Sequence, residues 1–264
     1  MVMGERIGKG MTAEVFGWGE GQVLKLYYDW FQLEWAQHEW RIAKAVNDAG
    51  SPSPRPIELM EIDGRLGLIY ERIKGSSMLA LMQASPQEAV KLAREMARLH
   101  DEIHRCAATG LPRQKEIMDK AVRDSASLLK DRASKVCAYL DALPEGNQIC
   151  HGDFHQGNIM LSDIGPVVID WNNATSGQPA SDVARTSLML RSPFVSELAG
   201  EGIKAVQYEM HRAYIEQYME LSVTSLAEVE AWMMPVAAAR LRENIPGERV
   251  WLLGMIEEML QGKG

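Results

Sequence analysis

A short polar segment in the second half of the chain holds residue types that catalysis requires. It reads HGDFHQGN and contains Asp153 and Asn158, and Asp170 follows twelve residues after Asn158. Apolar runs flank the segment, and its glycines permit tight backbone turns. The three side chains could therefore converge on one point. Phosphorylation of a hydroxyl needs such a set, because one carboxylate must orient the hydroxyl and accept its proton while oxygen ligands hold the Mg²⁺ that screens the phosphates.

Residues near the N-terminus supply groups that suit a nucleotide. The sequence IGKGMTAEV has a β-turn-β pattern in which Gly8 and Gly10 would let backbone N–H groups approach phosphate oxygens. Lys25 lies in the next apolar run and can direct its ammonium group at the α- and β-phosphates. A carboxylate should fix this lysine. Glu39 on the following helical stretch is the first candidate and Glu34 is the second.

The first quarter of the chain has the pattern of a small β-sheet with one helix. β-type runs cover residues 5–7, 14–18, 22–27, 57–62 and 66–73, and a helical pattern covers about 31–49. The last two β-type runs flank Asp63-Gly64, a dipeptide typical of hairpin turns. We expect an aromatic group to pack the helix onto the sheet: Tyr27, Tyr28, Trp30, Phe31, Trp35 and Trp40.

The remainder of the chain is mainly helical, with capping boxes predicted at Ser85 and Ser225. Helical patterns cover about 86–103, 113–143 and 180–264, and short β-type runs cover 148–150, 158–161 and 166–170. The sequence therefore predicts an α+β fold of two lobes. A β-rich lobe would span residues 1–74, and a larger, mainly helical lobe would span 75–264.

The composition is typical of a soluble globular protein. Of 264 residues, 46% are hydrophobic and 24% are charged, which excludes a disordered chain. No apolar run reaches the roughly 18–20 residues of a membrane-spanning helix, and the N-terminus lacks the apolar core of a secretory signal. The 28 Lys and Arg against 36 Asp and Glu give a net charge of −8, which disfavours nucleic acid as a partner. Three cysteines without CxxC spacing indicate neither a disulfide framework nor a zinc site, so we expect a cytoplasmic protein.

These features resemble the aminoglycoside phosphotransferase and choline kinase group, which are small-molecule kinases with the bilobal protein-kinase fold. The resemblance rests on the HxDxxxxN pattern, on Ile169-Asp170-Trp171, on the glycine-containing hairpin and on the Val-Leu-Lys strand. The spacing from Asp153 to Asn158 equals that between the catalytic-loop Asp and Asn of protein kinases. The resemblance covers residues 4–185 and includes YERIKG at 70–75 as the segment that connects the lobes.

The resemblance implies a role for each residue of the site. Asp153 becomes the catalytic base, and Asn158 and Asp170 become the Mg²⁺ ligands. The implied nucleotide-binding groups are Gly8, Gly10, Lys25 with its partner Glu39, and backbone groups near Glu71 and Ile73 for adenine. Asp182, in a segment similar to the family's Asp-Leu-Ala, would brace the catalytic loop. The implied reaction transfers the γ-phosphate of ATP, or of GTP, to a hydroxyl group of a small molecule.

Two other functions would use the same residues. His151, Asp153 and His155 alternate like ligands on a strand face, which suits a metallohydrolase but leaves Lys25 and Asn158 without a role. A non-catalytic nucleotide-binding pseudokinase would share the fold. Such proteins normally lose the lysine, the catalytic Asp or the metal-binding Asp, and all three are present here.

His100 and His104 lie one helical turn apart, a spacing that can chelate a metal ion. No nearby cysteine or third histidine supports a metal site. We therefore expect these two to be surface histidines or hydrogen-bonded core histidines.

The acceptor is the part of the reaction that the sequence specifies least. A polycationic aminoglycoside needs several carboxylates around its ammonium groups, whereas the residues after Asp170 read WNNATS, which are neutral and hydrogen-bonding. Trp171 could pack against a neutral ring or a single quaternary amine. Candidate carboxylates on the later helices are dispersed: Glu197, Glu201, Glu209 and Glu216.

We therefore predict a neutral or singly charged hydroxylated metabolite, such as an amino alcohol, a sugar or an amino acid. An aminoglycoside kinase is the alternative. The oligomeric state stays open.

Overall fold

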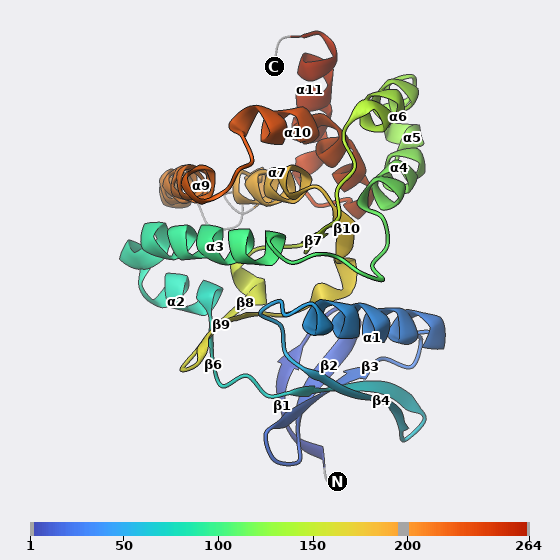
Figure 1. Ribbon diagram of the computed structural model, residues 1–264, viewed down its shortest axis with the longest axis vertical. Helices are drawn as coiled ribbons and strands as arrows, with labels where there is room; N and C mark the ends of the chain where they lie inside the picture. The colour runs from blue at the N-terminus through green and yellow to red at the C-terminus, as the bar shows by residue number, and fades with distance from the viewer. Residues whose placement is uncertain (1–2, 195–200, 263–264) are drawn as a thin grey trace.

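The computed structural model describes residues 3–194 and 201–262 and has a sheet at one end and a helical bundle at the other (Figure 1). The N-terminal sheet has five antiparallel strands in the order β1-β2-β3-β5-β4, with the helix α1 against it. Its elements are β1 (Met3–Lys9), β2 (Ala13–Trp18), β3 (Gln22–Tyr27), α1 (Leu33–Asp48), β4 (Pro56–Ile62) and β5 (Arg65–Glu71).

The alternation of side chains along β3 decides which of them can reach a ligand. Leu24 and Leu26 are buried in an apolar cluster on one face of the sheet. Lys25 and Tyr27 lie on the opposite face, where Tyr27 packs in a cluster with Ala36 of α1. A single charged residue in an apolar strand is thereby directed toward the helix that follows it.

The predicted aromatic packing is correct only in part. Tyr27 is buried and stacks on Phe31 with 4.1 Å between ring centroids. Trp30 is 58% exposed and Trp35 is 45% exposed. For these two the expectation is wrong, because Trp30 precedes α1 and Trp35 lies off the buried face of that helix.

Two small antiparallel sheets hold the polar segment that carries the catalytic candidates. The first contains β6 (Gly75–Ser77), β8 (Ile159–Ser162) and β9 (Gly165–Val168), and the second pairs β7 (Gln148–Cys150) with β10 (Thr175–Gly177). The segment from β7 to β8 includes a 3₁₀ turn, η2 (Gln156–Asn158), and a further turn, η3 (Trp171–Asn173), follows Asp170. The chain therefore passes twice through the region between the N-terminal sheet and the helical part (Figure 1).

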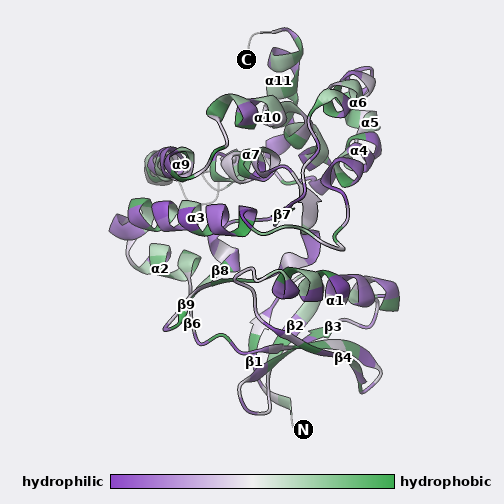
Figure 2. Ribbon diagram, viewed as in Figure 1, coloured by the Kyte–Doolittle hydropathy of each residue, from purple (hydrophilic) through white to green (hydrophobic). Residues whose placement is uncertain are grey.

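The rest of the fold is helical. The helices are α2 (Met78–Ala84), α3 (Ala89–His104), α4 (Gln114–Asp124), α5 (Ala126–Leu129), α6 (Arg132–Ala142), α7 (Pro179–Leu190), α9 (Glu201–Leu221), α10 (Leu226–Arg240) and α11 (Glu248–Leu260), with 3₁₀ turns η1 (Pro86–Glu88) and η4 (Leu241–Glu243). α3 packs along α9, and α10 contacts α4, α6 and α7. Most of these helices carry both hydrophilic and hydrophobic residues, as expected of helices that bury one face (Figure 2). No helix among the described residues is long and apolar enough to cross a membrane.

Two local predictions need correction. The helical pattern at 113–143 forms three helices rather than one, and Lys130 between the last two has a φ of 57°, outside the helical region. Ser85 makes no capping hydrogen bond, because the three residues after it form the turn η1 instead of an α-helix. Ser225 does form the predicted capping box with Glu228 at the start of α10.

The α+β fold with a β-rich N-terminal sheet and a helical C-terminal part is confirmed.

Candidate active site

A cavity of about 640 Å³ lies between the N-terminal sheet and the segment that holds the polar residues. Every site residue that the sequence predicted lines this cavity: Gly8, Gly10, Lys25, Glu39, Glu71, Ile73, Asp153, Asn158 and Asp170. The structure thus brings together two groups of residues, one before Lys74 and one after Gly152, that are far apart in the chain.

Lys25 connects the two groups. Its Nζ lies 2.7 Å from Oε1 of Glu39 and 3.3 Å from Oδ1 of Asp170. Burial alone would lower the pKa of Lys25, but the two carboxylates outweigh it and the pKa is raised. Lys25 is therefore a fixed cation at the wall of the cavity, and Glu39 rather than Glu34 is its partner on α1.

The glycine-containing hairpin offers backbone rather than side chains to the cavity. A Cβ added at Gly8 would come no closer than 3.5 Å to Val15, and one at Gly10 no closer than 3.6 Å to the carbonyl oxygen of Ala13. Both distances are ordinary van der Waals contacts. The folded protein would therefore tolerate a methyl group at either position, so the packing of the hairpin does not itself require glycine there.

The segment that connects the two parts of the fold also lines the cavity. The N–H of Glu71 donates to the carbonyl of Arg55 at 3.0 Å, and the Glu71 carboxylate accepts from the N–H of Arg55 at 2.8 Å. The strand β5 is thereby held firmly up to its last residue. Other backbone groups at Glu71 and at Ile73 remain as candidates for contact with an adenine ring.

The loop at residues 151–158, which we call the catalytic loop after its resemblance to that of kinases, is held together by its own side chains. Nδ2 of Asn158 donates to the carbonyl of Asp153 at 3.0 Å. The buried His151 ring accepts from the N–H of Asp153 at Nδ1 (3.2 Å) and donates from Nε2 to the carbonyl of Ile169 (3.1 Å). Burial lowers the pKa of His151, which keeps the ring neutral in this tautomer. His151 thus links the loop to the residue that precedes Asp170.

Asn158 and Asp170 suit a magnesium ion by their donor types. The amide nitrogen of Asn158 is used within the loop, so its carbonyl oxygen is the atom that can serve as a ligand. Asp170 has a φ of 62°, a left-handed backbone conformation that is uncommon for a residue other than glycine, and its side chain is partly exposed in the cavity. A carboxylate and an amide oxygen are hard ligands of the kind that Mg²⁺ prefers.

Asp153 is ionised at neutral pH. Burial would raise its pKa, but the nearby His155 ring, with Nε2 3.7 Å from Oδ2, and the positive charge of Arg185 outweigh burial, and the pKa falls to about 2. Nη2 of Arg185 lies 3.6 Å from Oδ1 of Asp153. A carboxylate of this kind can accept a hydrogen bond from a hydroxyl and hold it in place.

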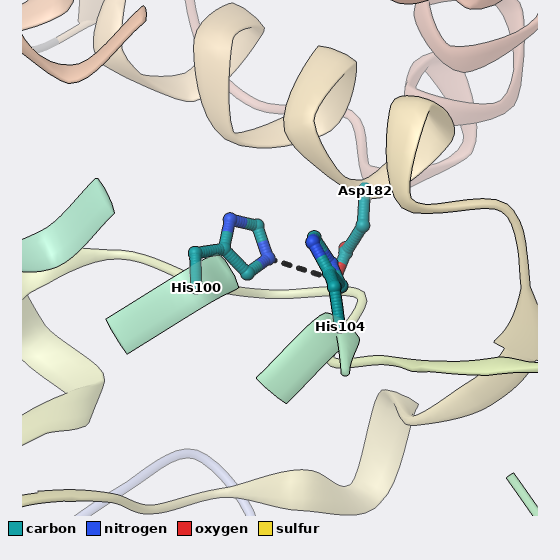
Figure 3. A group of neighbouring side chains, drawn as sticks. All are labelled: His100, His104 and Asp182. Carbon is teal, nitrogen blue, oxygen red and sulfur yellow. Dashed lines mark hydrogen bonds and ion pairs between the residues drawn. The ribbon is translucent and has the colours of Figure 1, made fainter. Parts of the chain in front are cut away.

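Asp182, on α7, braces the catalytic loop. Its carboxylate accepts from the backbone N–H of His151 at 2.6 Å and of Gly152 at 2.9 Å. It also accepts from Nε2 of His100 at 3.0 Å and of His104 at 3.3 Å (Figure 3). Burial would raise the pKa of Asp182, but these hydrogen bonds outweigh it and hold the pKa well below its usual range.

The two histidines are core residues with every ring nitrogen engaged. Nδ1 of His100 lies 2.7 Å from the hydroxyl of Tyr214, and Nδ1 of His104 lies 2.7 Å from that of Tyr218. Each ring donates from Nε2 and accepts at Nδ1 in one consistent tautomer. Although His100, His104 and Asp182 lie close enough to hold a metal ion, the hydrogen bonds already account for all of their ligand atoms. Of the two locations that we expected, the core is correct and the surface is wrong.

The comparisons with known proteins agree with this geometry. Residues 23–221, about three quarters of the chain, match the phosphotransferase enzyme family. The chain belongs to this family. It is therefore a kinase-type phosphotransferase, and the resemblance noted in its sequence is confirmed. None of the curated proteins matches the sequence.

Solved phosphotransferase structures share the whole fold at low sequence identity. The apo form of a thermostable mutant of aminoglycoside phosphotransferase APH(4)-Ia has a TM-score of 0.66 and 15% identity, over 99% of this chain and 94% of that chain. Choline kinase from Cryptosporidium parvum Iowa II has a TM-score of 0.57 and 13% identity, over 98% and 90%. Ternary complexes of mutants of the first enzyme contain hygromycin B with AMP-PNP or ADP. At these identities the likeness shows the fold.

Arg185 is a residue of this phosphotransferase site that sequence reasoning missed. Its Nε donates to the carbonyl of Gly152 in the catalytic loop, and its Nη1 donates to Oε1 of Glu243 at 2.7 Å. Arg185 follows Asp182 by three positions on α7, so both side chains can reach the loop from one helix face. That spacing is the signal that could have identified it.

Trp171 and the dispersed glutamates do not take the places that we considered for them near an acceptor. Trp171 lines the first cavity, but it is only 5% exposed and donates its indole N–H to the carbonyl of Val168 at 2.7 Å, so it is mainly a packing residue. Glu209 pairs with Arg212 on the surface of α9, and neither Glu209 nor Glu216 lines a described cavity. Glu197 and the side chain of Glu201 lie outside the described residues.

Proposed function

We propose that this protein transfers the γ-phosphate of ATP, or of GTP, to a hydroxyl group of a small molecule, with Mg²⁺ as the metal ion. The observation that carries the proposal is the single cavity in which Lys25, its partner Glu39, Asp153, Asn158 and Asp170 meet. These are the charges and ligands that phosphoryl transfer needs.

The nucleotide would lie with its phosphates toward Lys25 and its base toward the connecting segment. Backbone N–H groups of the hairpin at Gly8 and Gly10 would donate to phosphate oxygens. Apolar side chains from both parts of the fold line the cavity, which suits a flat base: Val15 and Val23 from the sheet, and Met160 and Ile169 from the segment with β8 and β9. Backbone groups at Glu71 and Ile73 would hydrogen-bond adenine.

In the reaction, the acceptor oxygen forms a bond to the γ-phosphorus while the bond to the β,γ-bridging oxygen breaks. ADP leaves with that electron pair, and the hydroxyl proton passes to the carboxylate of Asp153. A pKa of about 2 makes Asp153 a weak base, so its main contribution is to orient the hydroxyl, and the proton moves late. Asn158 and Asp170 would hold Mg²⁺, which neutralises charge on the phosphate oxygens when bound.

The two competing functions have less support. A metallohydrolase would need free ring nitrogens at His151, but both are used in hydrogen bonds within the loop. A pseudokinase would lack a group that is present here, since Lys25, Asp153 and Asp170 all line the cavity. The cysteines are all free, which suits a reducing compartment, and we place the activity in the cytoplasm, where ATP is available.

We further propose that the acceptor is neutral or singly charged. A polycation such as an aminoglycoside would need several unpaired carboxylates beside Asp153, whereas Asp182 and Glu243, which line a cavity together with Asp153, are already paired. The alternative, an aminoglycoside kinase, has support from the fold of the solved relatives.

Substitution of Asp153 by Asn tests the proposal. Turnover of Mg-ATP with a panel of amino alcohols, sugars and amino acids should fall by roughly 10²–10⁴-fold in kcat, while ATP binding stays close to that of the wild type. Asp163→Asn, in the exposed turn between β8 and β9, is the matched control and should leave kcat unchanged. Wild-type turnover in Asp153→Asn would remove this residue from the mechanism.

A further inference from the structure

A second cavity of about 330 Å³ shares Asp153 with the first and lies on the far side of this residue. The catalytic loop, α4, α7 and η4 enclose it. Part of its wall is apolar, from Ile117 and Met118 on α4, and Asn173 and Thr175 add neutral polar groups. Because Asp153 lines both cavities, an acceptor bound in the second could present its hydroxyl to Asp153 while a nucleotide occupies the first.

Apart from Asp153, the carboxylates that line this second cavity are already engaged. Asp182 is only 2% exposed and accepts from two backbone N–H groups and two histidines. Glu243 accepts from Nη1 of Arg185 at 2.7 Å and from Nη1 of Arg240 at 3.0 Å. Neither has charge left to pair with a cationic ligand.

One arginine that lines the second cavity is not held by a carboxylate at hydrogen-bond distance. Arg242 on η4 is 47% exposed, and Oδ2 of Asp124, its nearest described carboxylate, is 3.8 Å away and similarly exposed. An exposed ion pair at this distance contributes almost nothing to the stability of the fold. By contrast, Arg185 and Arg240 are both committed to carboxylates at hydrogen-bond distance. The guanidinium of Arg242 therefore has N–H donors available to a molecule that enters the cavity.

We propose, on the basis of the function proposed above, that the acceptor carries a carboxylate as well as its hydroxyl, and that Arg242 binds this carboxylate. A planar guanidinium matches a carboxylate with two parallel hydrogen bonds. A singly charged group fits better than a phosphate here, since Asp153, Glu243 and the phosphates of ATP would all repel a second negative charge. The phosphoryl group goes to the hydroxyl oxygen, and the carboxylate is unchanged by the reaction.

Matched pairs of compounds test this inference. Gluconate with glucitol, and glycerate with glycerol, differ in the carboxylate, and choline, kanamycin and glycerol phosphate complete the panel. Product formation with Mg-ATP, followed by mass spectrometry, should show phosphorylation of at least one acid, with a kcat/KM at least tenfold above that of its neutral partner.

Variants of Arg242 then test the residue. Arg242→Gln should reduce the preference for the acid over its neutral partner by roughly 10–100-fold, the range expected for a lost charge-assisted hydrogen bond. Arg242→Lys should keep part of the preference, because it keeps the charge but not the planar pair. The matched control is Arg249→Gln, since Arg249 is exposed on α11, bonds to Asn244 and lines neither cavity.

Several results would overturn the inference. These are turnover of neutral or cationic members as fast as the acids, an equal effect of Arg242→Gln on both members of a pair, or turnover of glycerol phosphate alone. Failure of every acid while Mg-ATP still binds would also overturn it. The proposed function fails on a different result, namely Mg-ATP binding that does not depend on Lys25 or Asp170.

Discussion

Replacement of His100 by Gln should change how the stability of the protein depends on pH. Burial, together with the neighbouring His104, lowers the pKa of His100 to about 3. The unfolded chain binds a proton at this residue below its ordinary pKa of about 6.5. Between these two pH values the unfolded state holds more protons, so the free energy of unfolding falls as the pH falls. Each pH unit below 6.5 costs about 1.4 kcal/mol, which gives about 2 kcal/mol at pH 5.

The His100→Gln variant lacks this pH-dependent fall in the free energy of unfolding. At pH 7.5 it should be less stable than the wild type by about 1–3 kcal/mol, because Gln can still donate to Asp182 but loses the contact with Tyr214. At pH 5 the difference should shrink by about 2 kcal/mol, or about 4–8 °C in Tm. The lowered pKa values of His151 and His211 affect both proteins equally.

Thermal melts of both proteins at pH 7.5 and pH 5.0 measure this difference directly. A stability gap that stays constant or widens at pH 5.0 would refute a neutral, buried His100 in the folded state.

Two further predictions concern groups around the nucleotide and the catalytic loop. Gly10→Ala should leave Tm nearly unchanged, because its Cβ makes only an ordinary contact with Ala13, yet should weaken Mg-ATP binding by roughly tenfold or more in calorimetry; a large loss of Tm with normal binding would contradict this. Arg185→Gln should lower kcat by roughly 10–100-fold with little change in the Kd for ATP, because Asp153 and the loop lose a guanidinium that positions them. Unchanged kcat in that variant would mean that the loop keeps its geometry without Arg185.

Local patterns were sufficient to place most of the predicted site residues in the cavity. The alternation along β3 directs Lys25 away from the apolar cluster of Leu24 and Leu26, and a glutamate two turns into α1 can then reach it. The five-residue spacing of Asp153 and Asn158 corresponds to a single loop closed by one hydrogen bond. These relations depend on residues close together in the chain or on adjacent elements, and a sequence displays them.

The parts that were missed depend on contacts between distant segments. Arg185 meets Glu243 across 58 positions, and His100 meets Tyr214 across 114. No periodicity or spacing reports these pairs, although the three-residue spacing from Asp182 could have placed Arg185 beside the loop. The predicted helix also breaks at Lys130, next to Leu129, which is fully buried in the common core. Packing of this kind overrides local helical preference.

Calorimetric binding of ATP to Lys25→Ala and Asp170→Ala, with and without Mg²⁺, tests the central claim most directly. Lys25→Ala should weaken ATP binding under both conditions, because in the proposed function its ammonium group would contact the phosphates. Asp170→Ala should weaken binding more with Mg²⁺ than without it, because its carboxylate would act through the ion. If both variants bound Mg-ATP as tightly as the wild type, the cavity would not be the nucleotide site and the proposed function would be contradicted.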